Sequence, residues 1–234
     1  MMTSHDHHTH EAHSTHQGHG ANEGHQDSTT EYDQTYWDTF YDERPAIWSG
    51  QPNPQLVTET AGLTPGTALD VGSGEGADAI WLARRGWKVT AVDISQVALT
   101  RGAANAAADE ESAALITWTR QDLLQWAPPE SSFDLISAQF MHLPKTEREP
   151  LFTRLAAAVT PGGTLLVVGH HPSDMESGAH RPPRLDLFYT AEEIALLLDP
   201  ERWDLVTESR QRTQDHDGET VTIHDAVLRA RRVS

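Results

Sequence analysis

Residues 67–86 read TALDVGSGEGADAIWLARRG, and this stretch decides the fold class. The run TALDV predicts a short buried strand, and ADAIWLARR predicts a helix. Between them, Gly72, Gly74 and Gly76 stand where the chain must turn tightly and where a ligand can approach the backbone. A strand, a glycine-rich turn and a helix in this order are typical of an α/β domain that binds a ligand at the turn.

Short apolar runs and helical segments alternate along the rest of the chain. We predict strands at Thr67–Val71, Lys88–Asp93, Leu115–Thr119, Phe133–Ala138, Thr164–Gly169, Trp203–Ser209 and Val221–Ala230. We predict helices at Pro54–Ala61, Glu75–Arg85, Gln96–Ala108, Leu123–Trp126, Glu147–Val159 and Ala191–Leu198. This alternation predicts a doubly wound, Rossmann-like, mostly parallel seven-stranded sheet with helices on both faces. The last two strands have no convincing helix between them, so we expect a C-terminal antiparallel hairpin.

The first 30 residues differ in composition from the rest of the chain. They hold almost no large apolar residue, so we expect 1–30 to be a disordered tail. Eight of the 14 histidines lie here, at His5, His7, His8, His10, His13, His16, His19 and His25. Clustered imidazoles can bind Ni²⁺, Zn²⁺ or Cu²⁺, and the alternative is a solubilising extension whose metal affinity is incidental.

One domain is expected over residues 31–234, opened by a helical cap at about 31–62. Four aromatic residues near its start fall on one helical face, at Tyr36, Trp37, Phe40 and Tyr41. The length of the chain leaves room for one sizeable core and little else.

Charge and cysteine content exclude several classes of function. The formal net charge is −18, from 35 acidic and 17 basic residues, so nucleic acid and anionic membranes are poor partners. The chain has no cysteine, which removes disulfides, thiolate metal sites and cysteine nucleophiles. No signal peptide or membrane-spanning run is recognisable, and we expect a cytoplasmic protein.

The acidic residues around the glycine turn bear on the ligand. Asp70 ends the first strand, and we place Glu75 and Asp78 in the first turn of the next helix. Carboxylates at this point would repel a pyrophosphate, although the glycine pattern also satisfies the relaxed dinucleotide fingerprint. S-adenosylmethionine has an ammonium and a sulfonium and no phosphate, so it suits an acidic strand end better. A NAD(P)-dependent oxidoreductase stays the alternative.

Two further aspartates end the next two predicted strands. Asp93 follows about twenty residues after the turn, where a carboxylate can accept the hydroxyls of a ribose from either cofactor. Asp122 follows the third strand, where it can accept the amino group of an adenine. Each aspartate alone can be a helix cap, but three at successive parallel strand ends favour an adenosine ligand.

The motifs together resemble the class I S-adenosylmethionine-dependent methyltransferases over residues 32–230. The resemblance rests on LDVGSGEG, VTAVDIS, RQDLL, FDLISAQFMHL and LAAAVTPGGTLLVVGHHP, in this order. It implies that the cofactor is held by Asp70, Gly72, Ser73, Gly74, Asp93, Ile94, Asp122, Leu123 and Gln139. The family has a cysteine between two glycines where this chain has Ser73, a mild departure because the backbone makes the contact.

The segment YWDTFYDERPAIWSGQPNPQL, ahead of the glycine turn, resembles the small-molecule branch that includes tellurite-resistance and thiopurine-type methyltransferases. In that branch an N-terminal helix and a tryptophan, here Trp48, cover the cofactor. The resemblance implies methyl transfer to a small acceptor such as a thiol, a chalcogen oxyanion or another heteroatom, with S-adenosylhomocysteine as the product.

Residues after the fourth and fifth strands are candidates for the acceptor side. We single out His142 as a proton acceptor, although a soft nucleophile needs none and a hydrogen-bonded loop histidine is an equal alternative. His170, His171 and Asp174 could bind a metal, but we expect none. Arg181 and Arg184 could clamp an anionic substrate or simply balance the acidic surface. A third function is a noncatalytic metal-handling protein that uses the histidine tail.

Overall fold

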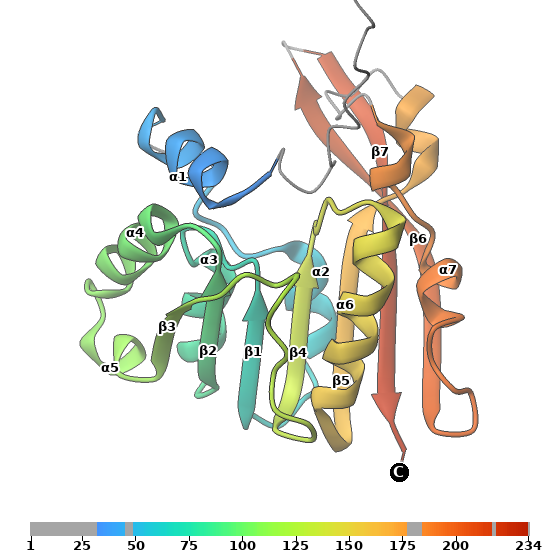
Figure 1. Cartoon of the computed structure of the whole chain (residues 1–234), viewed down its shortest axis with the longest axis horizontal. Helices are drawn as coiled ribbons and strands as arrows, with labels where there is room; N and C mark the ends of the chain where they lie inside the picture. Colours follow the sequence, from blue (N-terminus) through green and yellow to red (C-terminus); the bar gives the residue numbers. More distant parts are fainter. Residues whose placement is uncertain (1–31, 45–48, 177–183, 217–218, 234) are drawn as a thin grey trace, which may run out of the picture. The chain divides into compact units, whose positions relative to one another are not determined.

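The computed structural model describes residues 32–44, 49–176, 184–216 and 219–233. Its centre is a seven-stranded sheet with the strand order β3-β2-β1-β4-β5-β7-β6 (Figure 1). The strands are β1 Thr67–Val71, β2 Lys88–Asp93, β3 Ile116–Arg120, β4 Phe133–Gln139, β5 Val159–His170, β6 Trp203–His216 and β7 Glu219–Arg232. The first five strands are parallel and β7 is antiparallel to both neighbours, so the predicted sheet and hairpin are confirmed.

The helices lie on both faces of this sheet, as predicted. They are α1 Gln34–Asp42, α2 Pro54–Thr60, α3 Ala77–Ala83, α4 Gln96–Ala106, α5 Glu110–Ala113, α6 Lys145–Ala158 and α7 Ala191–Ala195, with short 3₁₀ helices at Pro172–Glu176 and Leu185–Leu187. No helix of the described segments is long and apolar enough to cross a membrane.

Alternate residues of the inner strands β1, β2, β4, β5 and β7 enter two separate apolar cores. Leu69 of β1 packs in the core covered by α6 and α7, which contribute Leu155 and Ile194. Its neighbour Ala68 packs in the other core, with Leu56 of α2. Because side chains alternate across a strand, each buried strand supplies both cores, and this is why these strands read as continuous apolar runs.

Several elements differ from the prediction. Residues Leu123–Trp126 form a turn and not a helix. Pro128 and Pro129 follow closely, and the helical conformation is disfavoured for a residue that precedes a proline. The helix α3 begins at Ala77, two residues later than predicted, because Gly76 precedes it in the left-handed region at φ 85°. The short helix α5 was not predicted at all.

The hairpin of β6 and β7 is longer than its apolar core. The two strands pair from Trp203 with Arg232 to His216 with Glu219. Pairing of β5 with β7 ends where His170 meets Asp225, so the remainder of the hairpin continues past the end of β5 (Figure 1). Since β7 runs antiparallel to β5, this extension stands at the carboxyl ends of the parallel strands, the edge that carries the glycine turn.

Candidate functional site

The glycine turn after β1 has a backbone that only glycine adopts easily. Gly72, Gly74 and Gly76 have φ values of 69°, 52° and 85°. The amides of Gly72 and Ser73 both donate to the carbonyl of Val92, each at 2.9 Å. These bonds attach the turn to the end of β2, so the two strand ends form one rigid unit.

Asp93, the last residue of β2, sits inside this unit and is 7% exposed. Its Oδ2 accepts the amide of Gly74 at 2.8 Å, and its Oδ1 accepts the amide of Ser95 at 2.9 Å. Burial raises the pKa of Asp93. The two bonds fix the carboxylate beside the turn and leave each oxygen further capacity to accept a hydroxyl.

Two more carboxyl groups approach the turn, the buried one of Asp70 and the half-buried one of Asp78. Asp70 is 2% exposed, and burial raises its pKa well above the ordinary value, with Asp78 and Asp93 adding to the effect by charge repulsion. Burial also raises the pKa of Asp78 to about 6, although Asp78 accepts the amide of Asn53 at 2.6 Å. Three acidic groups that resist ionisation at one place form a site suited to a cation.

Glu75 differs from this group and from our expectation. It lies before α3 and outside its first turn, and its carboxylate pairs with Arg101 at 3.3 Å. Its charge is therefore compensated within the protein. The acidic character of the turn comes from Asp70, Asp78 and Asp93.

Three buried polar atoms at the ends of β1 and β4 have no hydrogen-bond partner among the described residues. They are Asp70 Oδ2, Ser73 Oγ and Gln139 Oε1. The amide nitrogen of Gln139 donates to Ser137 Oγ at 2.8 Å, and Ser137 is the register partner of Asp70. Buried polar atoms are rarely left unpaired, so this cluster indicates a polar ligand placed against β1 and β4.

The predicted adenine side is more open. Asp122 is exposed and its Oδ1 accepts the amide of Leu124 at 2.9 Å. Leu123 is 8% exposed and packs in the core, while Ile94 is half-buried beside Asp93. The amide of Gln121 donates to the carbonyl of Asp93 at 2.9 Å, which holds the end of β3 against the end of β2.

The predicted histidine lies in an aromatic cluster beyond β4. The ring of His142 stacks on the ring of His170, with centroids 4.9 Å apart and an angle of 22°. Phe140 contacts the same ring at 4.7 Å and has a positive φ of 52°, a strained conformation for a residue with a side chain. Among the described residues no group of three His, Asp or Glu side chains could hold a metal ion, so the metal interpretation of His170, His171 and Asp174 finds no support.

Some residues singled out from the sequence cannot be placed or have another role. Trp48, Arg181 and the tail at 1–30 lie outside the described residues. Arg184 pairs with the nearby Asp186 at 2.7 Å, which favours the balancing role over a substrate clamp.

Sequence reasoning missed Asp38 on α1. Its Oδ1 accepts the hydroxyl of Ser95 at 2.7 Å and the amide of Val97 at 3.2 Å, which holds α1 at the start of α4, beside Asp93. The one available signal was Ser95 itself, a serine directly before a helix, whose hydroxyl caps that helix and has a proton to donate.

Comparison with known proteins agrees with this geometry. Residues 68–163 match the methyltransferase domain family. An uncharacterised methyltransferase of Mycobacterium tuberculosis is 39% identical over 111 residues, which are 47% of this chain and 53% of the relative. Trans-aconitate 2-methyltransferase of Rhizobium meliloti is 33% identical over 159 residues, 67% of this chain and 54% of the relative. The chain thus spans about half the length of these curated relatives.

Solved structures share the fold at low sequence identity. The N-methyltransferase NodS of Bradyrhizobium japonicum, in complex with S-adenosylhomocysteine, has a TM-score of 0.63 and 20% identity, over 86% of this chain and all of that chain (100%). TehB of Haemophilus influenzae has a TM-score of 0.62 and 18% identity, over 85% of this chain and 66% of that one.

Proposed function

We propose that this chain, whose residues 68–163 match the methyltransferase domain family and whose fold is shared with an N-methyltransferase in complex with S-adenosylhomocysteine, transfers a methyl group from S-adenosylmethionine to a small molecule. The observation that carries the proposal is the cluster of unsatisfied atoms Asp70 Oδ2, Ser73 Oγ and Gln139 Oε1 beside the glycine turn. A carboxylate oxygen and an amide oxygen accept hydrogen bonds from an ammonium. The serine hydroxyl can donate to a carboxylate.

The other predicted residues are assigned to the ribose and the adenine of the cofactor. Asp93 is fixed by two backbone amides and can accept the two ribose hydroxyls. Ile94, Asp122 and Leu123 surround the adenine side, and Trp48 is proposed as a cover. The cationic cofactor offsets the repulsion among Asp70, Asp78 and Asp93, which a dinucleotide would increase.

The protein's own part in the reaction is alignment and exclusion of water. Bound S-adenosylmethionine supplies a methyl carbon already activated by its sulfonium. We assign His142 the role of accepting a proton from acceptors that carry one, with its ring held by the stack on His170.

The names of the relatives support a small acceptor. One relative acts on trans-aconitate by its name, and another, from Mycobacteroides abscessus, is a 2-heptyl-1-hydroxyquinolin-4(1H)-one methyltransferase, 30% identical over 125 residues. Both named substrates are small organic molecules. Thiols, tellurite, selenite and phenols belong in the same assay panel, with formation of S-adenosylhomocysteine as the measure.

Calorimetry with S-adenosylmethionine, S-adenosylhomocysteine and NADH tests the proposal. We expect micromolar binding of the two adenosyl thioethers and none of NADH. Asp93→Asn should weaken the binding of both thioethers at least about tenfold, because the side-chain amide replaces one acceptor oxygen by a donor. The control is Asp204→Asn, which makes the same change at an exposed residue of β6 and should leave both affinities unchanged. Binding of NADH without the thioethers would overturn the proposal.

A further inference from the structure

Polar side chains form a row across one face of the sheet, from the cofactor side to the hairpin. Asp70 pairs in register with Ser137, Gln139 stands two residues further along β4, and His170 pairs with Asp225 of β7. These positions alternate with residues of the α6 core, so all of them face the side of the sheet that α2 and α3 cover. The strand order β1-β4-β5-β7-β6 then places Arg212, on β6, at the far end of the row.

Arg212 is held at one nitrogen only. Its Nε donates to Asp225 Oδ2 at 2.8 Å, and this is the one hydrogen bond that it makes with the described residues. The Arg212 side chain is 31% exposed, while Asp225 is 1% exposed. The buried carboxylate therefore orients the guanidinium and leaves the N–H groups of both terminal nitrogens available to a ligand.

The neighbouring arginine on the same face is different. Arg210 donates to Gln55 at 2.9 Å, to Glu59 at 2.5 Å and to Glu208 at 2.5 Å, so all three of its nitrogens have partners. Gln55 in turn donates to Asp225 Oδ2 at 3.1 Å. Arg210 links α2 to the hairpin, whereas the terminal nitrogens of Arg212 have N–H donors that make no hydrogen bond with the described residues.

The guanidinium of Arg212 lies beside the aromatic cluster. Its carbon is 5.9 Å from the centroid of Phe140, whose ring contacts His170, and His170 stacks on His142. The two ends of the row thus have opposite character. Carboxyl groups gather at the glycine turn, and an oriented cation stands beside Phe140, whose neighbour His170 stacks on the proposed proton acceptor.

We propose that Arg212 recognises a carboxylate of the methyl acceptor and places the acceptor against the ring of Phe140. This proposal rests on the proposed function, since it concerns the acceptor side of the same site. The planar pair of N–H groups on a guanidinium matches the two oxygens of a carboxylate. A doubly charged phosphate fits less well, because the carboxylate of Asp225 lies against the guanidinium. In a chain with net charge −18, an anionic acceptor needs a dedicated cation of this kind.

Binding of small carboxylates to the full-length protein tests the proposal. The probes are benzoate and succinate, each compared with its amide, measured by calorimetry or ligand-observed NMR with and without saturating S-adenosylhomocysteine. We expect the carboxylates to bind the wild-type protein about tenfold or more tighter than the amides. Arg212→Gln should abolish this preference.

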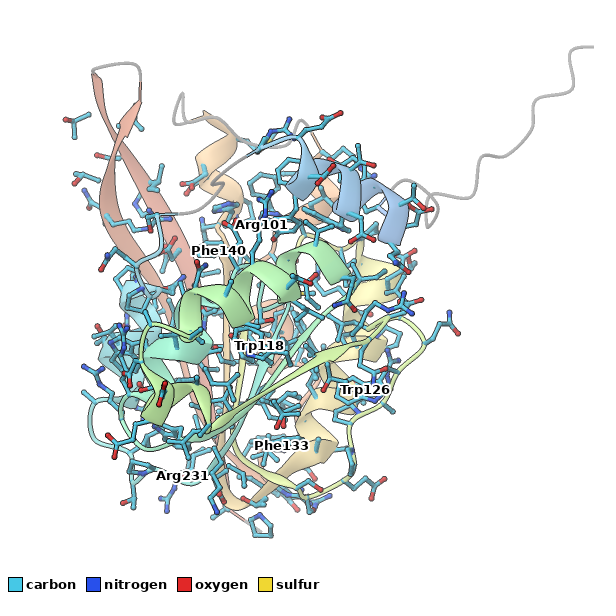
Figure 2. All side chains as sticks on the ribbon, turned by 90° about the vertical axis from the view of Figure 1, so that its left-hand side faces the viewer. Arg101, Trp118, Trp126, Phe133, Phe140 and Arg231 are labelled. Carbon is cyan, nitrogen blue, oxygen red and sulfur yellow. The ribbon has the colours of Figure 1, made fainter. Side chains whose placement is uncertain are left out.

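Arg231→Gln is the matched control. It removes the same charge from an exposed position near the end of β7, and Figure 2 labels Arg231 and Phe140 towards opposite ends of the molecule. This variant should keep the preference. Because Arg212→Gln leaves Asp225 uncompensated, the double variant Arg212→Gln with Asp225→Asn provides a second test in which no unpaired buried charge remains.

The outcomes separate this proposal from the proposed function. Equal binding of carboxylates and amides to wild type, or a preference that survives in both Arg212 variants, overturns the role of Arg212 even if S-adenosylhomocysteine binds. A preference that depends on Arg212 in a protein that does not bind S-adenosylhomocysteine supports the anion site and overturns the proposed function.

Discussion

Single residues around the glycine turn hold protons more tightly than free carboxyl groups do. Burial raises the pKa of Asp78 from 3.8 to about 6, so between these values the folded protein binds a proton that the unfolded chain has released. A carboxyl group with a raised pKa contributes to stability at low pH, and this contribution is lost as the pH rises through the pKa of the folded state.

The raised pKa of Asp78 should make the free energy of unfolding depend on pH. As the pH rises from about 4 to 6, wild type should lose about 2 kcal/mol relative to Asp78→Asn, and the difference should become constant above about pH 7. Urea unfolding of both cofactor-free proteins across this range measures it. A difference that does not change with pH would show that Asp78 has an ordinary pKa.

We expect the carboxyl group of Asp70 to lower the stability of the free protein and to strengthen binding of the cofactor. Its buried carboxyl group repels Asp78 and Asp93 in the absence of a ligand. Asp70→Asn should therefore stabilise the free protein by roughly 1 kcal/mol, and it should weaken the binding of S-adenosylmethionine at least about tenfold. Thermal unfolding and calorimetry on the same preparation measure both effects. Loss of stability without loss of affinity would mean that Asp70 is structural.

At the scale of elements, α4 packs against β3 through a glycine. A Cβ added to Gly102 would lie 2.6 Å from Cζ3 of Trp118, and one added to Gly76 would lie 2.3 Å from Cη2 of the same ring. Figure 2 shows Trp118 beside α4. The indole thus occupies the space that two glycines leave open.

Gly102→Ala separates this packing from helix propensity. Within a helix, alanine normally stabilises relative to glycine by about 1 kcal/mol, but here the clash should destabilise by roughly 1–3 kcal/mol. In a Trp118→Leu background the clash is absent and the same change should be neutral or stabilising. A double-mutant cycle by urea unfolding measures the coupling. Additive effects would mean that the ring moves aside at little cost.

At the scale of the whole molecule, the histidine-rich segment and the domain should act independently. Removing residues 1–30 deletes eight histidines and leaves every residue that we place at the cofactor site. We expect unchanged calorimetric binding of S-adenosylhomocysteine and much weaker binding of Ni²⁺. A loss of cofactor affinity on truncation would show that the segment contributes to the site.

Part of the site was determined by local sequence. The runs TALDV and KVTAVD predict β1 and β2 to the residue, because buried parallel strands are continuous apolar runs that end at turn residues. That placement puts Asp70 one residue before the end of β1 and Asp93 at the end of β2, and the glycines between them have the positive φ values that the turn requires. These features depend on residues adjacent in the chain, so the sequence by itself was sufficient.

Only the tertiary structure decided the features that join distant residues. Asp38 bonds to Ser95 across 57 positions, and Gln55 bonds to Asp225 across 170. The pairing of Glu75 with Arg101, the length of the hairpin and the position of Arg212 beside Phe140 are of the same kind. No periodicity records which strand lies beside which. Such contacts are set by the order of strands in the sheet, which brings separate parts of the chain to one edge.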